Sequence, residues 1–394
     1  MKHICFVVNK YPNPKEPFAC IFVQQLAWKM SELGIKVSVI CPLPVNINPY
    51  YLCLPYKTTE ITEKGTTVDV YFPKTIGLGQ SKFFFGKSPV RTTTFFLKHA
   101  ARRVIKKMKI LPDVFYGHFI SPSGVASAQL GREFNIPSFF ACGEANNTIK
   151  HDKIYQFGKE KLQRELLSVK GVIAVSTALK KYLVDNEIID EEKIDVFPNG
   201  FDVRKFARID RYEARESLGL PQDKFTVSFL GAFNNRKGII RVCQAIEEID
   251  DSCLICAGFG DLKPYGDKCV FVEKLNHDKV PLFLSASDVF VLPTLNEGCC
   301  NAIVEAMACG LPIISSDRPF NDDILDDSCS IRVDPENVEE IRDAINRLAC
   351  DKQLREKLSQ GALNRGKELT LDVRARRIIE FIDERINTSK KETE

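Results

Sequence analysis

The stretch Asp288-Val-Phe-Val-Leu-Pro-Thr-Leu-Asn-Glu297-Gly-Cys-Cys-Asn-Ala-Ile-Val-Glu305-Ala-Met-Ala-Cys-Gly310-Leu-Pro312 decides the fold. Residues Val289 to Leu292 form a short apolar run that stops at a Pro-Thr turn. A continuous apolar run of this length is typical of a strand whose two faces are both covered. A helix is predicted to begin near Cys300 and to end at Gly310-Leu-Pro. The stretch therefore indicates a strand, a loop and a helix of a parallel α/β sheet.

Two carboxylates, Glu297 and Glu305, lie eight positions apart in this stretch. On a helical path this spacing is roughly 12 Å, which is about the span from a sugar across a diphosphate to a ribose. Carboxylates accept hydrogen bonds from vicinal hydroxyls. The N–H groups at the helix start can meet an anion between them. This helix start comprises Gly298, Cys299, Cys300 and Asn301. A merely solvating role for Glu305 is disfavoured by its apolar neighbours.

The same alternation of strand and helix runs through all 394 residues. Strands are expected at residues 3–8, 37–40, 68–72, 114–116, 138–141 and 172–175, and, after a restart, at 226–230, 253–257, 270–272, 289–292 and 312–315. This pattern predicts α/β architecture with two doubly wound parallel sheets. We expect a first domain of residues 1–200, to which a helix at 371–388 returns, and a second domain of residues 201–370.

The net charge of +3 conceals an asymmetry between the halves. Residues 1–200 hold 27 basic and 17 acidic residues, whereas the remainder holds 28 and 35. Much of the excess lies in 74–109, where no acidic residue occurs and aromatic residues are interleaved. This stretch either contacts an anionic membrane surface or forms a solvated helix whose Phe residues pack inward, and we favour the first. No recognised nucleic-acid module accompanies it, so no nucleic-acid partner is expected.

Composition narrows the class further. No apolar run reaches the roughly 20 residues that span a bilayer, and the first apolar run is too short for a signal peptide. The 14 cysteines are scattered, mostly in apolar runs, as reduced core thiols are. Cys253 and Cys256 have ligand-like spacing but no second pair, so no metal site is predicted. We expect a cytoplasmic protein, peripheral at the inner face of the cell membrane if the basic stretch binds there.

Several motifs follow predicted strands, at the sheet edge where ligands of parallel sheets bind. Gly231 permits a tight exit from one strand, and Arg236 and Lys237 then bring cations to a helix start, where a phosphate is the obvious anion. On these residues alone, a solvated basic turn has equal weight. Gly258 and Gly260 form a second, weaker glycine turn that allows close backbone approach to a ligand.

The set of motifs resembles the retaining nucleotide-sugar glycosyltransferases of family 4, which have the GT-B fold and an E-x7-E signature. Glu297 to Glu305, with Glu-Ala-Met-Ala-Cys-Gly-Leu-Pro behind, matches that signature. Val196-Phe-Pro-Asn-Gly-Phe-Asp202 and Ala174-Val-Ser176-Thr-Ala-Leu-Lys are similar to the inter-domain turn and the segment before it. The resemblance covers nearly the whole chain. It implies two Rossmann-like domains facing a cleft, with the last helix crossing back.

The resemblance also implies roles for individual residues. Glu297 would bind donor-sugar hydroxyls, Glu305 the ribose, and Lys237 with Arg236 the diphosphate. His118, which follows a predicted strand in Tyr116-Gly-His118-Phe-Ile-Ser-Pro-Ser-Gly124, would face the cleft, although an isolated histidine of this kind is more often structural. The further donor-binding positions are Cys20, Ser176, Asn199, Val272 and Lys274. Departures from the family pattern are Ala232, Glu273 and Cys20, where Arg, Gly and Gly are usual, and Glu144, which is one residue closer to Gly143.

The sequence therefore predicts transfer of a hexosyl unit from a nucleoside diphosphate sugar to a glycan or polyprenyl-linked acceptor, in cell-surface polysaccharide synthesis. No cofactor is expected, and no Asp-x-Asp pair adjoins the donor residues to bind a metal. Two alternatives stay open. One is a nucleotide-sugar epimerase on the same architecture, and the other is a non-catalytic subunit that binds a sugar nucleotide.

Overall fold

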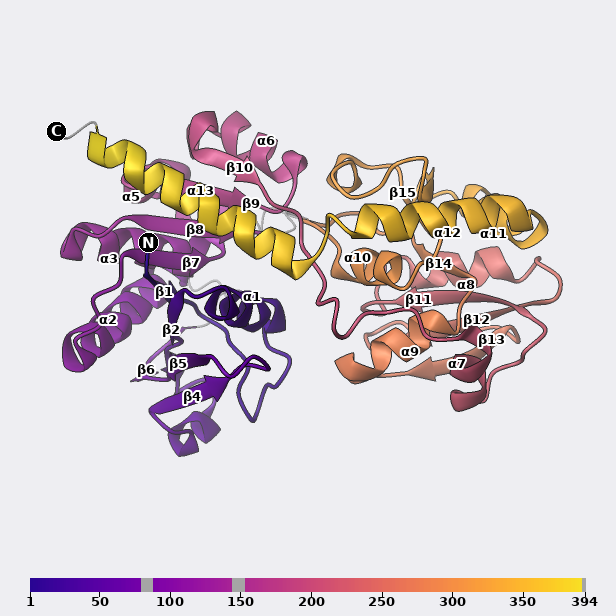
Figure 1. The fold of residues 1–394 in the computed structure, drawn as a ribbon, viewed down its shortest axis with the longest axis horizontal. Coiled ribbons are helices and arrows are strands. Elements are labelled where there is room, and N and C mark those ends of the chain that lie inside the picture. The colour runs from indigo at the N-terminus through magenta and orange to yellow at the C-terminus, as the bar shows by residue number, and fades with distance from the viewer. Residues whose placement is uncertain (79–87, 144–152, 392–394) are drawn as a thin grey trace. The chain divides into compact units, whose positions relative to one another are not determined.

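The computed structural model describes residues 1–78, 88–143 and 153–391. The chain divides into two compact units, and Figure 1 shows the elements of each. The first unit comprises Met1–Phe197 and Arg374–Glu394, and the second comprises Pro198–Val373. The last helix, α13 (Leu371–Lys391), therefore starts in the second unit and continues into the first.

The first unit is built on an eight-stranded sheet of order β10-β9-β8-β7-β1-β2-β5-β4. A separate two-stranded parallel sheet is formed by β3 and β6, which follow β2 and β5 in the sequence. All pairs of the large sheet are parallel except β4–β5, an antiparallel hairpin at the edge. The strands are β1 (His3–Val7), β2 (Lys36–Ile40), β3 (Leu43–Pro44), β4 (Lys57–Ile61), β5 (Thr67–Tyr71), β6 (Lys74–Thr75), β7 (Val114–His118), β8 (Ser138–Cys142), β9 (Gly171–Ala174) and β10 (Ile194–Val196).

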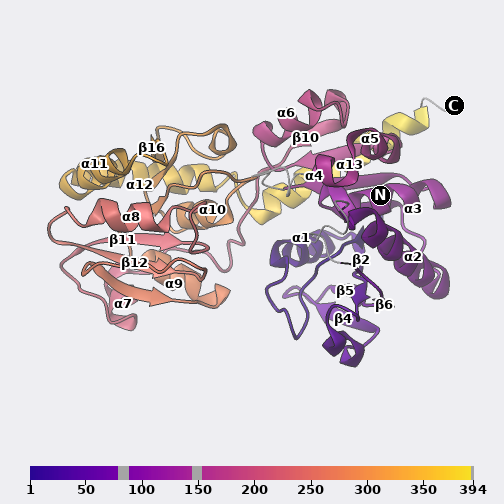
Figure 2. The same cartoon turned by 180° about the vertical axis from the view of Figure 1, so that it is seen from behind.

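Helices cover both faces of this sheet. The described helices are α1 (Ile21–Glu32), η1 (Pro49–Cys53), α2 (Val90–Met108), η2 (Ile120–Gly124), α3 (Val125–Phe134), α4 (Lys153–Phe157), α5 (Lys159–Leu166), α6 (Thr177–Asp185) and η3 (Glu191–Lys193). Alternate residues of β1 separate the two cores: Ile4 and Phe6 pack with α1 and α13, whereas Cys5 and Val7 pack with α2 and α3. Figure 2, seen from behind, shows α2 and α3 on their side of the sheet.

The second unit has one fully parallel sheet of order β13-β12-β11-β14-β15-β16. Its strands are β11 (Phe225–Leu230), β12 (Ser252–Ala257), β13 (Cys269–Glu273), β14 (Val289–Leu292), β15 (Ile313–Ser316) and β16 (Ser330–Val333). Its helices are α7 (Arg211–Ser217), α8 (Ile239–Ile246), η4 (His277–Lys279), α9 (Val280–Ser285), α10 (Asn301–Ala308), η5 (Pro319–Asn321), α11 (Val338–Cys350) and α12 (Lys352–Gly366).

The predicted doubly wound parallel sheets are confirmed, but the prediction missed the edge strands β4, β10 and β16 and the short pair β3 and β6. In the order of the second sheet, strands run outward in both directions from the β11–β14 pair, as in a dinucleotide-binding fold. The hairpin strand β4 was not among the predicted strands because its residues alternate between exposed and half-buried and form no apolar run. Edge strands of this kind carry little periodic signal.

Helix α13 completes the apolar core on one face of the first sheet. Phe381 is buried, and its ring centroid lies 5.4 Å from that of Phe197 and 6.2 Å from that of Phe139. A Cβ added to Gly171 would lie 2.8 Å from ring atoms of both Phe139 and Phe381. The glycine therefore makes room for the aromatic ring of a helix about 200 residues further along the chain.

Phe381→Ala is expected to destabilise the first unit by about 3–5 kcal/mol, because it leaves a cavity between β8, β9 and α13. Trp28, the only tryptophan, lies in α1 of this unit, so its fluorescence in urea reports the unfolding of this unit. Phe95→Ala is the control, since Phe95 is 54% exposed. An unchanged urea midpoint for Phe381→Ala would show that α13 does not hold this core.

Candidate functional site

The strand order of the second sheet predicts where a ligand binds. The order reverses between β11 and β14, and the loops that leave neighbouring strands there diverge to open a crevice at the carboxyl edge. The loop after β11 carries Arg236 and Lys237, and the loop after β14 carries Glu297. The charged residues predicted from two distant motifs therefore flank the reversal point.

One carboxylate oxygen joins the two loops. Glu297 Oε1 accepts hydrogen bonds from Arg236 Nη1 at 2.5 Å and from Thr294 Oγ1 at 3.0 Å, and it lies 2.6 Å from Lys237 Nζ. Arg236 Nη1 also donates to the Asn296 carbonyl oxygen at 2.7 Å. Two backbone groups support the contact, since the N–H of Leu295 donates to the Arg236 carbonyl oxygen at 2.8 Å.

The electrostatics of this cluster keep all three groups ionised. Burial alone would lower the pKa of Lys237, but Cys300 and Glu297 outweigh it and raise the pKa. Burial alone would raise the pKa of Glu297, but the charges of Lys237 and Arg236 hold it below the usual range. Two cations face one carboxylate, so the cluster has a net positive charge at neutral pH, which favours an anion beside it.

The loop between the carboxylates leads directly into helix α10, as the sequence predicts. Cys300 is the N-cap residue of α10, and its thiol lies close to the N–H groups of Ala302 and Ile303 in the first turn. Lys237 Nζ donates to Cys300 Sγ at 3.7 Å, and burial raises the pKa of that thiol. Asn199 Nδ2 donates to the Cys299 carbonyl oxygen at 3.0 Å, which fixes the loop from the other side.

The glycines after β11 and β12 hold two loops close together. Gly258 has φ of 155°, and a Cβ there would lie 1.9 Å from the carbonyl oxygen of Gly231. A Cβ on Gly260 would lie 2.2 Å from the Phe233 carbonyl oxygen. The close approach that both glycines permit is to the backbone of the neighbouring loop. These positions therefore shape the wall of the crevice.

The end of β13 presents an exposed apolar and cationic surface. Phe259 is 66% exposed, and Lys274 Nζ lies 4.7 Å from the centroid of its ring. Val272 is half exposed on the same strand. Glu273, which stands where the family usually has glycine, offers its carbonyl oxygen to the N–H of Gly258 at 2.9 Å. An exposed aromatic ring and a valine are suitable groups for stacking a nucleotide base.

The second carboxylate has a partner that the sequence did not indicate. Glu305 lies on the second turn of α10, and its Oε1 accepts a hydrogen bond from His277 Nε2 at 3.0 Å. The His277 ring in turn packs edge-on against Phe206, with centroids 5.3 Å apart. His277 and Glu305 are 28 residues apart and belong to the separate helices η4 and α10, so no sequence spacing relates them.

His118 lies in the first unit, at the last position of β7. The order of the first sheet reverses between β1 and β7, so His118 also flanks a reversal point. Burial, reinforced by the Arg374 guanidinium, lowers the pKa of His118 to about 3. The imidazole is therefore neutral at physiological pH, and its Nδ1 has no hydrogen-bond partner among the described residues.

The other predicted residues of the first unit have structural roles that are now visible. Cys20 precedes α1 with φ of 52° and ψ of 43°, the left-handed conformation in which glycine is favoured. The glycine expected at this position therefore matches the observed backbone. Ser176 is the N-cap of α6, and its Oγ accepts a hydrogen bond from the N–H of Leu179 at 3.3 Å. Glu144 lies outside the described residues, as do Lys82, Lys87 and Phe83–Phe85 of the basic stretch.

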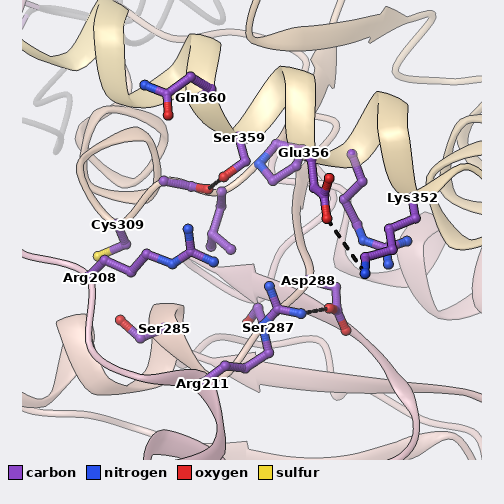
Figure 3. Close-up of a pocket in the computed structure, with 14 residues that line it drawn as sticks. Arg208, Arg211, Ser285, Ser287, Asp288, Cys309, Lys352, Glu356, Ser359 and Gln360 are labelled. Atoms are coloured by element: carbon purple, nitrogen blue, oxygen red, sulfur yellow. Dashed lines mark hydrogen bonds and ion pairs between the residues drawn. The ribbon is translucent and has the colours of Figure 1, made fainter.

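A polar cavity of about 300 Å³ in the second unit lies at the opposite edge of the sheet from the cluster (Figure 3). Asp288 precedes β14 there and accepts hydrogen bonds from Arg211, from Arg215 Nη2 at 2.7 Å and from the N–H of Thr226 at 2.8 Å. Lys352 and Glu356 of α12 form an ion pair across one turn. These contacts fasten α7 to the sheet, so this cavity is separate from the crevice.

Two family profiles match the chain along almost its whole length. Residues 21–205 match Glycosyltransferase Family 4, and residues 210–365 match Glycosyl transferases group 1. The chain belongs to the family 4 glycosyltransferases. The second match contains the Arg236–Lys237–Glu297 cluster and Glu305, and the first contains His118 and Ser176. The predicted family membership is confirmed.

Relatives of this glycosyltransferase share part of its sequence. It is 27% identical over 358 residues to the putative teichuronic acid biosynthesis glycosyltransferase TuaC of Bacillus subtilis, covering 87% of this chain and 88% of TuaC. It is 34% identical over 156 residues to the UDP-Gal:alpha-D-GlcNAc-diphosphoundecaprenol alpha-1,3-galactosyltransferase of Escherichia coli, covering 35% of this chain and 40% of that enzyme.

Solved structures confirm the GT-B fold. A sucrose-phosphate synthase from Thermosynechococcus elongatus superposes with a TM-score of 0.76 at 18% identity, covering 98% of this chain and 100% of the synthase. HepE from Anabaena, solved in complex with UDP, gives a TM-score of 0.71 at 15% identity, again with 98% and 100% coverage. Identities this low establish the fold of the glycosyltransferase and nothing finer.

The described residues contain neither a metal-binding group nor a helix that could span a membrane. Among residues 1–78, 88–143 and 153–391, no three His, Cys, Asp or Glu side chains form a group that could hold a metal ion. No helix within those same ranges has the length and apolar character that crossing a membrane requires.

His277→Ala is expected to raise the KM for the sugar-nucleotide donor about tenfold while changing kcat less than threefold, because Glu305 loses the hydrogen bond that orients it for the ribose. His277→Gln, which keeps a donor, should restore part of the affinity. His99→Ala is the control, since His99 lies on α2 in the first unit. A fall in kcat with an unchanged KM would contradict this orienting role.

Proposed function

We propose that this glycosyltransferase moves a hexosyl unit from a nucleoside diphosphate sugar to a glycan or lipid-linked acceptor, with retention of configuration, in cell-surface polysaccharide synthesis. The observation that carries the proposal is the cluster of Arg236, Lys237 and Glu297 beside the α10 helix start. TuaC by its name belongs to teichuronic acid biosynthesis, and the Escherichia coli relative by its name uses a diphosphoundecaprenol-linked acceptor. Both names support the acceptor class.

The cluster suits a diphosphate leaving group. When the bond between the anomeric carbon and the phosphate oxygen breaks, negative charge grows on the diphosphate, and preorganised cations stabilise that charge best. Lys237 is held in place by Glu297 and Cys300, and Arg236 by Glu297 and the Asn296 carbonyl oxygen. The first turn of α10 adds backbone N–H groups.

Glu297 is better suited to holding the donor than to attacking it. A carboxylate whose pKa is lowered is a weaker nucleophile than one of ordinary basicity. Here Oε1 accepts two hydrogen bonds beside a lysine ammonium, and those cations hold the pKa of Glu297 low. The acceptor oxygen would therefore bond to the anomeric carbon on the face that the diphosphate leaves. The proton of the acceptor hydroxyl passes to the departing phosphate oxygen.

A thermal-shift panel of UDP, GDP and ADP sugars, followed by transfer assays with the stabilising donor, tests the donor class. NMR of the product anomeric proton tests retention, and an inverted configuration would refute it. Donor turnover without any acceptor would favour an epimerase. Nucleotide binding with no turnover under any condition would favour a non-catalytic subunit.

Lys237→Ala is expected to lower kcat by about 100-fold or more, because one preorganised cation no longer meets the charge on the leaving diphosphate. The donor KM should rise much less, and circular dichroism should match that of the wild type. Lys352→Ala is the matched control in the same unit, since the Lys352 side chain is 77% exposed and lies at the other sheet edge. Equal kcat in Lys237→Ala and wild type would refute the assigned role.

Exposed cations on and next to helix α2 support peripheral membrane binding. They are only part of the basic stretch 74–109. Lys98 and Arg102 both form ion pairs with Glu133 of α3, so one of their two charges is offset. Arg103, Lys106 and Lys109 are exposed and form no ion pair with any described residue. Phe95, which is 54% exposed, precedes Arg103 by two turns on the same helix face.

Replacing Arg103, Lys106 and Lys109 together by alanine should weaken partition onto anionic vesicles roughly 100-fold, at about 1 kcal/mol per cation. Co-sedimentation at low and high salt measures the effect, which should fade as salt rises. Lys352→Ala and neutral vesicles are the controls. Unchanged sedimentation of the triple variant would show that α2 is a solvated helix.

A further inference from the structure

A cavity of about 530 Å³ lies in the first unit beside the reversal point of its sheet. Asn9 and Lys10, directly after β1, line one side, and Thr93 and Leu97 of α2 line another. Asn9 Oδ1 accepts a hydrogen bond from Ser123 Oγ at 3.1 Å, which ties this wall to the segment that follows His118. The cavity therefore adjoins the carboxyl edge of the first sheet, where ligands of parallel sheets bind.

The inner part of the cavity is polar. Asn13 and Gln156, both 7% exposed, line it, and Tyr51 donates a hydrogen bond to Glu16 at 2.6 Å across its floor. Lys10 is exposed and makes no ion pair with any described residue. The cavity thus carries the Lys10 ammonium, the Glu16 carboxylate, to which Tyr51 already donates, and two amides. Of these groups, Lys10 and the amides can bind a phosphate and its neighbouring sugar.

The outer part is an apolar lip formed by two loops. The parallel strands β3 and β6 extend past the main sheet, and the loops that follow them carry Ile47 and Ile76. Both side chains line the cavity, yet Ile47 is 53% and Ile76 51% exposed. The Asn46 side chain fastens the loops by accepting from the N–H of Gly77 at 2.9 Å and donating to its carbonyl oxygen at 2.7 Å.

This lip has a rigid backbone and exposed apolar tips, which is an unusual combination for a solvated loop. Two isoleucines held at a cavity mouth expose apolar surface that water solvates poorly. A ligand that is polar at one end, anionic in the middle and apolar at the other would match the polar floor, Lys10 and the lip in turn.

We propose that this cavity binds the head of a lipid-linked acceptor, with Lys10 facing its phosphate and with Ile47 and Ile76 covering the first part of its hydrocarbon chain. The inference rests on the proposed function, which includes a lipid-linked acceptor, and it adds the site where that acceptor binds. Helix α2 forms one wall of the cavity and also carries the exposed cations of the proposed membrane surface. A lipid held in an anionic leaflet can therefore reach the cavity mouth along the same helix.

The experiment measures binding of two probes to the full chain by microscale thermophoresis, namely undecaprenyl phosphate in detergent micelles and the phosphate of a single isoprene unit. The wild type should bind the long chain at least tenfold more tightly than the short one. The double variant Ile47→Ser with Ile76→Ser should lose about tenfold in affinity for the long chain and less than twofold for the short chain. Both side chains are half exposed, so the variant is expected to fold.

Ile61→Ser is the matched control, because Ile61 lies on β4 in the same unit, is 70% exposed and does not line the cavity. Lys10→Gln should weaken binding of both phosphates and leave undecaprenol itself unaffected. A wild type without chain-length preference, an equal loss in Ile61→Ser, or a silent Lys10→Gln would each overturn the proposal. Transfer is not measured here, so an enzyme that binds the lipid phosphate but transfers no sugar would contradict the proposed function alone.

Discussion

The contact of Glu297 with Arg236 and Lys237 is the interaction on which the second unit depends for its function. Two like charges on adjacent residues repel each other and cannot be held beside a ligand unless something fixes them. One buried carboxylate oxygen does so, and it comes from the strand that neighbours theirs in the sheet. The reversal of strand order makes this possible, because only there do loops from paired strands leave toward opposite faces.

The same topological rule organises the first unit with different chemistry. Its reversal point lies between β1 and β7, and the groups around it are a neutral histidine, amides and hydroxyls instead of an ion cluster. A diphosphate needs compensating charge, whereas an acceptor hydroxyl needs a polar, weakly charged surface that does not compete for its proton. The net charge of each half of the sequence does not reflect the charge at its reversal point. The first half is basic overall because its excess Lys and Arg residues lie largely on α2 and near it.

The sequence predicted the elements well and the contacts between them poorly. Apolar runs gave β11, β12 and β14 nearly to the residue because both faces of these strands are buried. The ion cluster joins residues 61 positions apart, and the pair of His277 and Glu305 joins two helices that no local pattern relates. Residue types at strand ends indicate that a site exists, but the partner of each side chain depends on how two loops fold over one sheet edge.

At three positions this chain has a residue other than the one usual in the family. At these positions the structure shows whether the backbone or the side chain makes the contact. Cys20 adopts a left-handed backbone, in which glycine is favoured, at a conformational cost of roughly 1 kcal/mol. Glu273 contributes only its carbonyl oxygen to Gly258, a contact that any residue could make. At Ala232 the missing guanidinium leaves Arg236 and Lys237 as the cations of this loop that contact Glu297, and Glu297 therefore positions both cations that would meet the diphosphate.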